Sequence, residues 1–484
     1  MKISFRQALA SPVQFYDHIL TGADDDFESQ MIRVLIDYKQ GRQQQAYKRY
    51  ENLLDTLNIP KNILLIDQLE LLDEKKACLL LFELLFSFKY NVNLSQKQLW
   101  KYVNSISVFD PDDVICHGAI YNLMIVFFLR FTNLAAAFEL ANMALKAYEY
   151  CDSHYLQLFV YLHMAYIHVY AGRLDEALEA LEQARKQLDL CGRPVCENAM
   201  IEITQHWVIA ERDNIFPSSQ DLEPLSKEIM SGEFWPETFL VMASLQFRTA
   251  ILEGNQHILE SHSGFELILR TRGMAQLLPA MQLLREEFLL DNKYLQTKQQ
   301  LELSERHVVL LLPTTKMWQI NTGDKPLPKP NLLRVQAVAD LLEAKQAYKS
   351  GRFNLAINSF KLAFENIKAH SWNYLLIAER DFINEICKEC RVRGRFVQIA
   401  RDCQNLLPVI MSSKTKYNNN QFGLTASELG VLNRLNGASS NKEIAREIGI
   451  SESTVKFHLK NIYKKLSAEN RNDALNIASE KGLI

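Results

Sequence analysis

A row of basic side chains near the C-terminus gives the clearest indication of function. Residues 452–466 predict a helix in which apolar side chains recur at i, i+4, i+7 and i+11 to form one buried stripe: Val455, Leu459, Ile462 and Leu466. The other side carries three lysines and no acid, and it consists of Ser453, Lys456, Phe457, Lys460 and Lys464. Such a row fits the major groove of DNA, with the early residues at base edges and the later lysines near phosphates. The alternative is an ordinary solvated lysine-rich face.

Four short helices are expected in the last 61 residues. The predicted caps and stops are Thr425 with Glu428, Gly437, Ser440 or Asn441, Gly449–Ser451, and Asn470. Two helices joined by about three residues that include a glycine form the helix-turn-helix arrangement. The charge distribution agrees with a local DNA-binding role, because residues 424–484 hold nine Lys and Arg against seven Asp and Glu while the whole chain carries a net charge of −3.

This C-terminal segment closely resembles the LuxR-type helix-turn-helix. The residues that carry the resemblance are Leu424-Thr425, Glu428, Val431-Leu432, Gly437, Ser440 to Ala445, Ile450-Ser451, Thr454 to Lys456, His458-Leu459, Asn461-Ile462, Lys465-Leu466, Asn470-Arg471 and Ala474. The sequence departs from the family pattern at Ser427, at Gly430, at Ser467-Ala468, and at Phe457, where a smaller residue is common. Because a phenylalanine can contact a thymine methyl group, the DNA sequence that is bound is expected to differ from that of relatives.

The resemblance implies a role for each matching position. It places Lys456, Phe457 and Lys460 at base-reading positions. It implies contacts with the DNA backbone for Ser440, Asn441, Lys442, Ser453, Thr454 and Lys464. In this family the last helix commonly pairs two subunits, and the corresponding residues are Ala474, Leu475 and Ala478.

Most of the chain before this segment shows an internal repeat. A glycine is followed by alanine at +5, a large residue at +9 and alanine at +12, beginning at Gly172 and Gly351, with a variant at Gly41 and a weaker copy at Thr132. Such a pattern predicts helix hairpins, because the glycine permits a left-handed turn and the alanines let the second helix pack closely. Further turns are expected near Asn91, Asp213, Gly254, Asn292 and Gly394. The pattern resembles the tetratricopeptide repeat and is similar to the degenerate array of MalT-like regulators, with an unrelated helical bundle as the alternative.

These patterns predict an all-α fold with three parts. Residues 1–410 are expected to form a tetratricopeptide-like α-solenoid with an irregular, partly strand-like insertion over 303–332. Residues 411–422 are expected to be a polar linker, and residues 423–484 the LuxR-type domain. The low content of 17 Gly and 13 Pro in 484 residues favours long helices over a turn-rich β fold.

Several other classes of protein are disfavoured. The chain has no phosphate-binding G-x-x-x-x-G-K-[ST] loop, no receiver-like pattern and no apolar run long enough for a membrane span. Its eight scattered cysteines, including Cys387 and Cys390, are expected to be reduced cytoplasmic thiols, and His163 a packing or surface residue. No nucleophile–base set stands out. We therefore expect neither an enzyme nor a cofactor or metal site.

The sequence thus predicts a cytoplasmic bacterial transcription regulator. It would bind an inverted repeat in promoter DNA as a dimer. The sequence leaves both activation and repression open, and the family resemblance favours an activator that contacts RNA polymerase. A small molecule, peptide or protein bound to the solenoid would control it. The alternative is an adaptor whose solenoid binds a partner protein and whose C-terminal domain serves mainly for pairing.

Overall fold

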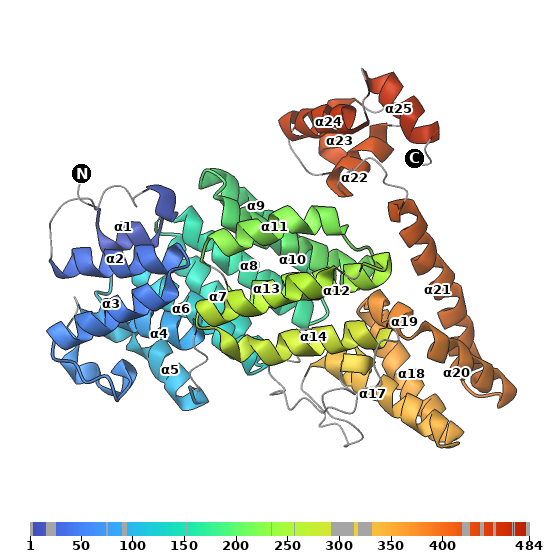
Figure 1. Cartoon of the computed structure of the whole chain (residues 1–484), viewed down its shortest axis with the longest axis horizontal. Coiled ribbons are helices and arrows are strands. Elements are labelled where there is room, and N and C mark those ends of the chain that lie inside the picture. Colours follow the sequence, from blue (N-terminus) through green and yellow to red (C-terminus); the bar gives the residue numbers. More distant parts are fainter. Residues whose placement is uncertain are drawn as a thin grey trace. The chain divides into compact units, whose positions relative to one another are not determined.

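The computed structural model describes residues 3–15, 26–73, 76–89, 94–151, 153–233, 235–255, 257–291, 314–317, 332–418, 426–435, 440–448, 452–466, 468 and 470–480. Within these ranges every regular element is a helix, which confirms the predicted all-α class (Figure 1). Spatial contacts divide the chain into two compact units: Met1–Arg212 with Phe216–Arg401, and Asp213–Ile215 with Asp402–Ile484.

Four helix hairpins form the most extensively packed pairs of the first unit. They are α2 (Phe27–Lys39) with α3 (Gln43–Thr56), α6 (Val114–Arg130) with α7 (Leu134–Tyr148), α8 (His154–Tyr170) with α9 (Leu174–Leu190), and α17 (Leu333–Lys349) with α18 (Phe353–Ala369). Each hairpin coincides with one of the predicted repeats. The helical repeat region is therefore as expected from the sequence.

The repeat alanines hold the two helices of each hairpin close together. Ala177 and Ala184 of α9, and Ala356 and Ala363 of α18, are completely buried. A larger side chain at any of these positions would separate the helices or force neighbouring side chains out of their rotamers.

The predicted turns adopt the left-handed backbone conformation. The φ angle is +73° at Gly172 and +73° at Gly351, and Thr132 takes +57° at the weaker copy. At the turn expected near Asp213, the left-handed residue is its neighbour Asn214, with φ of +55°. The turns predicted at Asn91 and Asn292 lie outside the described residues.

The remaining α-helices of this part of the chain complete the array. They are α1 (Phe5–Leu9), α4 (Leu79–Lys89), α5 (Gln96–Asn104), α10 (Val195–Asp213), α11 (Ser219–Ser231), α12 (Pro236–Glu253), α13 (Ile258–Thr271), α14 (Leu278–Asp291), α19 (Asn373–Ala378), α20 (Arg380–Val392) and α21 (Val397–Asn418). Helix α21 continues through residues 411–418, where an irregular linker is expected; the segment has no glycine or proline to end the helix. All eight cysteines are free thiols.

A buried ion cluster joins three helices of the first unit. The carboxylate of Glu211 on α10 accepts hydrogen bonds from Arg248 of α12 (3.0 Å) and from Arg334 of α17 (2.9 and 3.1 Å). The side chains of all three residues are at most 2% exposed. Burial lowers the pKa of Arg334, and the charge of Glu211 opposes that effect.

The predicted insertion is described only at residues 314–317 and 332. Thr314 donates a hydrogen bond to the buried carboxylate of Glu287, and Thr315 donates one to that of Glu379. Lys345 is also paired with Glu379, at 2.7 Å. This short piece is therefore anchored to the packed helices at both threonines. The rest of the predicted insertion over 303–332, apart from residue 332, falls outside the described residues, so its partly strand-like character stays a prediction.

Candidate nucleic-acid interface

Four short helices build the C-terminal domain: α22 (Ala426–Leu435), α23 (Asn441–Ile448), α24 (Glu452–Leu466) and α25 (Arg471–Glu480). The buried residues of their common core are Val431, Leu432, Leu435, Ile444, Ala445, Val455, Leu459, Ile462, Leu466, Ala474 and Ala478. All four residues of the predicted apolar stripe on α24 belong to this core. The stripe fixes the rotation of α24 and so determines which side chains face outward.

Hydrogen bonds at the helix ends set where α23 and α25 begin. The Ser440 hydroxyl accepts from the backbone N–H of Glu443 at 3.3 Å, and the Glu443 carboxylate accepts from the N–H of Ser440 at 2.6 Å. Ser440, rather than Asn441, is therefore the cap of α23. Asn470 caps α25 through an acceptor contact of 3.0 Å with the N–H of Asp473. The predicted turns at Gly437 and at 449–451, and the cap at Thr425, lie outside the described residues.

Glu428 pairs with a later helix of the domain. Its side chain is only 3% exposed, and its carboxylate lies 2.8 Å from the ammonium group of Lys465 on α24. Its predicted contact with Thr425 falls outside the described residues. Arg471 of α25 also donates to the carbonyl of Leu435 at 3.2 Å. These two contacts tie α22 to the helices that follow it.

The outward face of α24 presents the predicted base-reading residues together. Lys456 has a side chain that is 62% exposed, Phe457 is 60% exposed, and Lys460 is exposed one turn later. Lys464 is exposed at the far end of the same face. An exposed phenylalanine between lysines contributes nothing to the domain core, which favours a role in contact with another molecule.

The backbone-contacting positions predicted from the resemblance are less uniform. Ser440 and Lys442 are exposed at the start of α23, whereas Asn441 and Thr454 are half-buried. Nothing is described of the side chain of Ser453. The exposed pair at the start of α23 combines a helix N-terminus with a lysine, an arrangement that suits a phosphate group.

This surface also carries one acid that was not predicted. Glu452 begins α24, and its carboxylate Oε1 lies 2.8 Å from Nζ of Lys456. The hydrogen bond and charge of Lys456, with a smaller effect from the charge of Lys442, lower the pKa of Glu452. The i, i+4 spacing of the two residues could have revealed the pair.

The residues predicted for subunit pairing do not share one environment. Ala474 and Ala478 are completely buried within the core of their own domain, and Leu475 is half-buried against it. The two alanines are therefore not available to a second subunit in this arrangement. Among residues 471–478 of the same helix, whose burial is described, Asn472 and Asn476 are exposed.

Packing of α23 against α24 over a shared core, with α24 exposing a basic face, defines a helix-turn-helix domain. Residues 423–478 match the luxR family of bacterial regulatory proteins. The C-terminal part of this chain is thus a LuxR-type helix-turn-helix domain, as the sequence resemblance indicates.

Transcriptional regulators are among the similar proteins. The chain is 33% identical over 130 residues to the transcriptional regulatory protein YdfI of Bacillus subtilis, and the aligned region covers 26% of this chain and 59% of YdfI. It is 43% identical over 70 residues to the CsgBAC operon transcriptional regulatory protein of Escherichia coli, which covers 14% of this chain and 32% of that protein. It is 36% identical over 72 residues to the HTH-type transcriptional regulator AlkS of Alcanivorax borkumensis, which covers 15% of this chain and 8% of AlkS. The chain thus spans less than two thirds of each relative, and no solved structure matches it significantly.

The described part of the chain contains no helix that is both long and apolar enough to cross a membrane. In the same part of the chain, no three His, Cys, Asp or Glu side chains are grouped so that they could hold a metal ion.

Proposed function

We propose that this protein is a bacterial transcription regulator that binds double-stranded DNA through α24. The observation that carries the proposal is the joint exposure of Lys456, Phe457 and Lys460 on one face of a helix whose opposite face is locked into the domain core. A helix held in this way can enter the major groove without rearrangement of the domain.

Each side chain of this face suits one kind of contact. A lysine ammonium group can donate to O6 and N7 of guanine, and a phenylalanine ring can pack on the methyl group of thymine. Lys464 lies farther along α24, where it would meet a phosphate, and Lys442 with the N-terminus of α23 would meet another. Lys456 and Lys460 would therefore determine sequence choice, whereas Lys442 and Lys464 would determine affinity.

The regulator would act as a dimer on an inverted-repeat site, since paired domains read both half-sites in opposite orientation. Pairing through α25 would have to use its exposed residues and the partly buried Leu475, because Ala474 and Ala478 are occupied by the domain core. The helical repeat region would bind an effector that changes DNA binding, in the cytoplasm, and the promoter-bound dimer would contact RNA polymerase. Neither a cofactor nor a catalytic step is needed for this function.

The test is selection of bound fragments from a random DNA pool by the full chain at two salt concentrations. Enrichment of an inverted repeat is expected. Lys456→Ala and Lys460→Ala should each cost about 1–3 kcal/mol on the selected site and relax base choice, whereas Lys464→Ala should weaken all sequences alike and reduce the salt dependence. If Lys456→Ala matched the wild type in both affinity and site preference, α24 would not be the reading helix. If the full chain enriched no DNA, the adaptor function would be favoured.

A further inference from the structure

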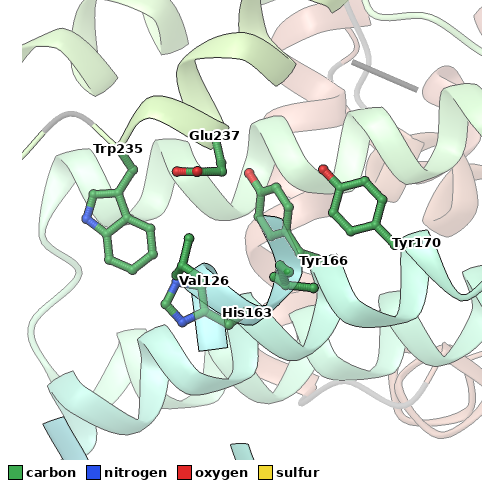
Figure 2. Close-up of a pocket in the computed structure, with 7 residues that line it drawn as sticks. Val126, His163, Tyr166, Tyr170, Trp235 and Glu237 are labelled. Atoms are coloured by element: carbon green, nitrogen blue, oxygen red, sulfur yellow. The ribbon is translucent and has the colours of Figure 1, made fainter. Parts of the chain in front are cut away.

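Two neighbouring cavities lie inside the helical repeat region, and Trp235 lines both. The smaller one, of about 10 Å³, is enclosed by residues of α6, α8 and the start of α12: Val126, Leu129, His163, Tyr166, Tyr170, Trp235 and Glu237. Figure 2 shows His163, Tyr166 and Tyr170 projecting from one helix, with Trp235 and Glu237 across the cavity from them. The larger one, of about 60 Å³, is lined mainly by aliphatic and aromatic side chains, among them Leu35, Leu81 and Leu123.

The smaller cavity holds a buried hydrogen-bond acceptor on His163. Nδ1 of this residue lies 2.8 Å from Oδ1 of Asn122, which lines the larger cavity. Because an amide oxygen only accepts, Nδ1 carries the proton of a neutral imidazole. Burial lowers the pKa of His163 to about 3, which keeps the ring neutral and makes Nε2 a lone-pair acceptor. Nε2 has no hydrogen-bond partner among the described residues.

A second buried acceptor faces the same cavity. Oε1 of Glu237 accepts two hydrogen bonds from Arg130, at 2.8 and 3.0 Å, but Oε2 has no hydrogen-bond partner in the described part of the chain. Glu237 is 7% exposed. A buried acceptor without a donor is costly, so two of them lining one cavity point to a bound molecule that supplies donors.

The charges around the cavities favour an uncharged molecule. The carboxylate of Glu237 is already neutralised by Arg130. Two residues of opposite charge, Lys39 and Glu233, line the larger cavity, and the charge of Glu233 acts on Lys39. Lys39 also donates to the carbonyl oxygens of Ala8, Leu9 and Ser11 at 2.9, 3.0 and 2.7 Å, and so has no N–H left for a ligand. Each charge at the cavities thus has an opposite charge beside it, so a charged ligand would be desolvated without gaining an unmatched counter-charge.

The size and the lining of the cavities indicate what the remaining part of the ligand is. Room for roughly four water molecules in the larger cavity suits a short aliphatic chain. The ring of Trp235 stacks on Phe159 at 4.9 Å and on His163 at 4.6 Å, and thereby forms an apolar wall common to both cavities.

We propose that these cavities bind a small uncharged organic molecule whose N–H or O–H group donates to His163 Nε2 and Glu237 Oε2 and whose short aliphatic chain occupies the leucine-lined space. Short primary carboxamides and alcohols have this chemistry. Such a molecule would be the effector of the proposed function. Its role in regulation rests on that proposed function, whereas its binding to the cavities does not. A single water molecule bonded to the two acceptors is the competing occupant.

The test compares two probes of equal size on the full chain without DNA. Butyramide carries an NH2 group where 2-pentanone carries a methyl group, and the two are otherwise alike. Binding is followed by ligand-observed NMR and by tryptophan fluorescence. We expect butyramide to bind at least about tenfold more tightly than 2-pentanone, since the ketone leaves both acceptors unpaired.

Two leucine variants locate the site. His163→Leu should remove the preference for butyramide, whereas His168→Leu, at a buried histidine of the same helix that lines neither cavity, should keep it. Equal affinity for the two probes, or no binding up to the solubility limit of butyramide, would overturn the proposal and leave water as the occupant. The probe comparison on the wild type decides even if His163→Leu does not fold. Because DNA is absent, a negative result leaves the proposed DNA binding to its own test.

Discussion

Nζ of Lys456 lies 2.8 Å from Oε1 of Glu452, one turn away on the exposed side of α24. Both side chains are about half exposed or more, at 62% and 47%. A guanine base or a phosphate that approaches Lys456 therefore meets a lysine that already has an anionic partner. A glutamate is ionised at neutral pH, and Lys456 lowers the pKa of Glu452 further, so we expect the acid to oppose DNA at every sequence.

Glu452→Gln should therefore strengthen binding to all DNA sequences. We expect a gain of about twofold to fivefold at low salt, the scale of an exposed ion pair, and a smaller gain at high salt because salt screens the charge. Fluorescence anisotropy with a selected site and with random DNA measures both. Glu179→Gln, an exposed residue of α9 with the same change in net charge, is the matched control and should change nothing. Weaker binding by Glu452→Gln would mean that the carboxylate itself contacts a base.

Phe457→Ala should separate recognition from stability. Because the ring is 60% exposed, its loss should change the free energy of unfolding by no more than about 0.5 kcal/mol. Fragment selection with the variant should lose a preference for thymine at one position of each half-site. Leu459→Ala, two residues along the same helix but only 6% exposed, should instead cost about 2–5 kcal/mol. Unaltered site preference in Phe457→Ala would exclude a base contact by this ring.

Lys465→Met should loosen the C-terminal domain, because it leaves the buried carboxylate of Glu428 without its cation. We expect a loss of about 1–2 kcal/mol, reduced from that of a fully buried pair since the Lys465 side chain is 34% exposed. Hydrogen exchange of peptides from α24 in the full chain should become faster. The neighbouring variant Lys464→Met changes an exposed lysine and should exchange like the wild type. Equal exchange in both variants would show that the pair does not stabilise the domain.

Glu211→Gln should destabilise the helical repeat region strongly. Its carboxylate is the shared partner of Arg248 and Arg334, and all three side chains are buried, so the substitution leaves two guanidinium groups without their anion. The expected cost is about 3–5 kcal/mol in urea unfolding. Asp175→Asn breaks the pair with Arg212, in which the aspartate is 80% exposed, and should cost less than about 1 kcal/mol. Similar midpoints for the two variants would contradict the importance of the buried cluster.

His163 should make the stability of the first unit depend on pH. Its pKa in the folded protein is about 3 against an ordinary value of 6.5, so below pH 6.5 the unfolded chain takes up a proton that the folded chain does not. Stability is then lost as the pH falls from 6.5 towards 3, with a slope that approaches about 1.4 kcal/mol per pH unit from this residue. Urea unfolding of the wild type and of His163→Leu at about pH 7 and about pH 5 should show a smaller pH effect in the variant. An equal pH effect would mean that folding does not lower the pKa of His163.

The repeat hairpins were predictable because their physical requirement is local. A left-handed turn followed by small residues at fixed spacing restricts both backbone and packing, and Gly172 and Gly351 satisfy this with a single residue type. Helix α24 was predictable for a similar reason, because the apolar residues of its buried stripe recur at the spacing of an α-helix throughout its length. The continuation of α21 through residues 411–418 does not follow from composition, because a polar segment without hydrophobic periodicity is typical of a linker as well as of an exposed helix.

The features that could not be predicted depend on contacts between residues far apart in the sequence. Ala474 and Ala478 are buried because α25 packs on the rest of its domain. The sequence could not show this, because an alanine is equally suited to a domain core and to a subunit interface. The acceptors of His163 and Glu237 meet only because α8 and α12 fold together, so neither residue stands out in its own segment. The pair of Glu428 with Lys465 joins positions 37 residues apart in the same way.

The buried cluster of Glu211, Arg248 and Arg334 connects two stretches of the chain that lie far apart in sequence. Arg334 follows residues 292–331 in sequence, whereas Glu211 and Arg248 precede them, yet the three form one contact. Cutting the polypeptide within 292–331 would therefore yield two fragments that stay associated through this contact and the helices around it. The chain could then be produced as two complementing pieces, with the repeat hairpin of α17 and α18 on the second piece.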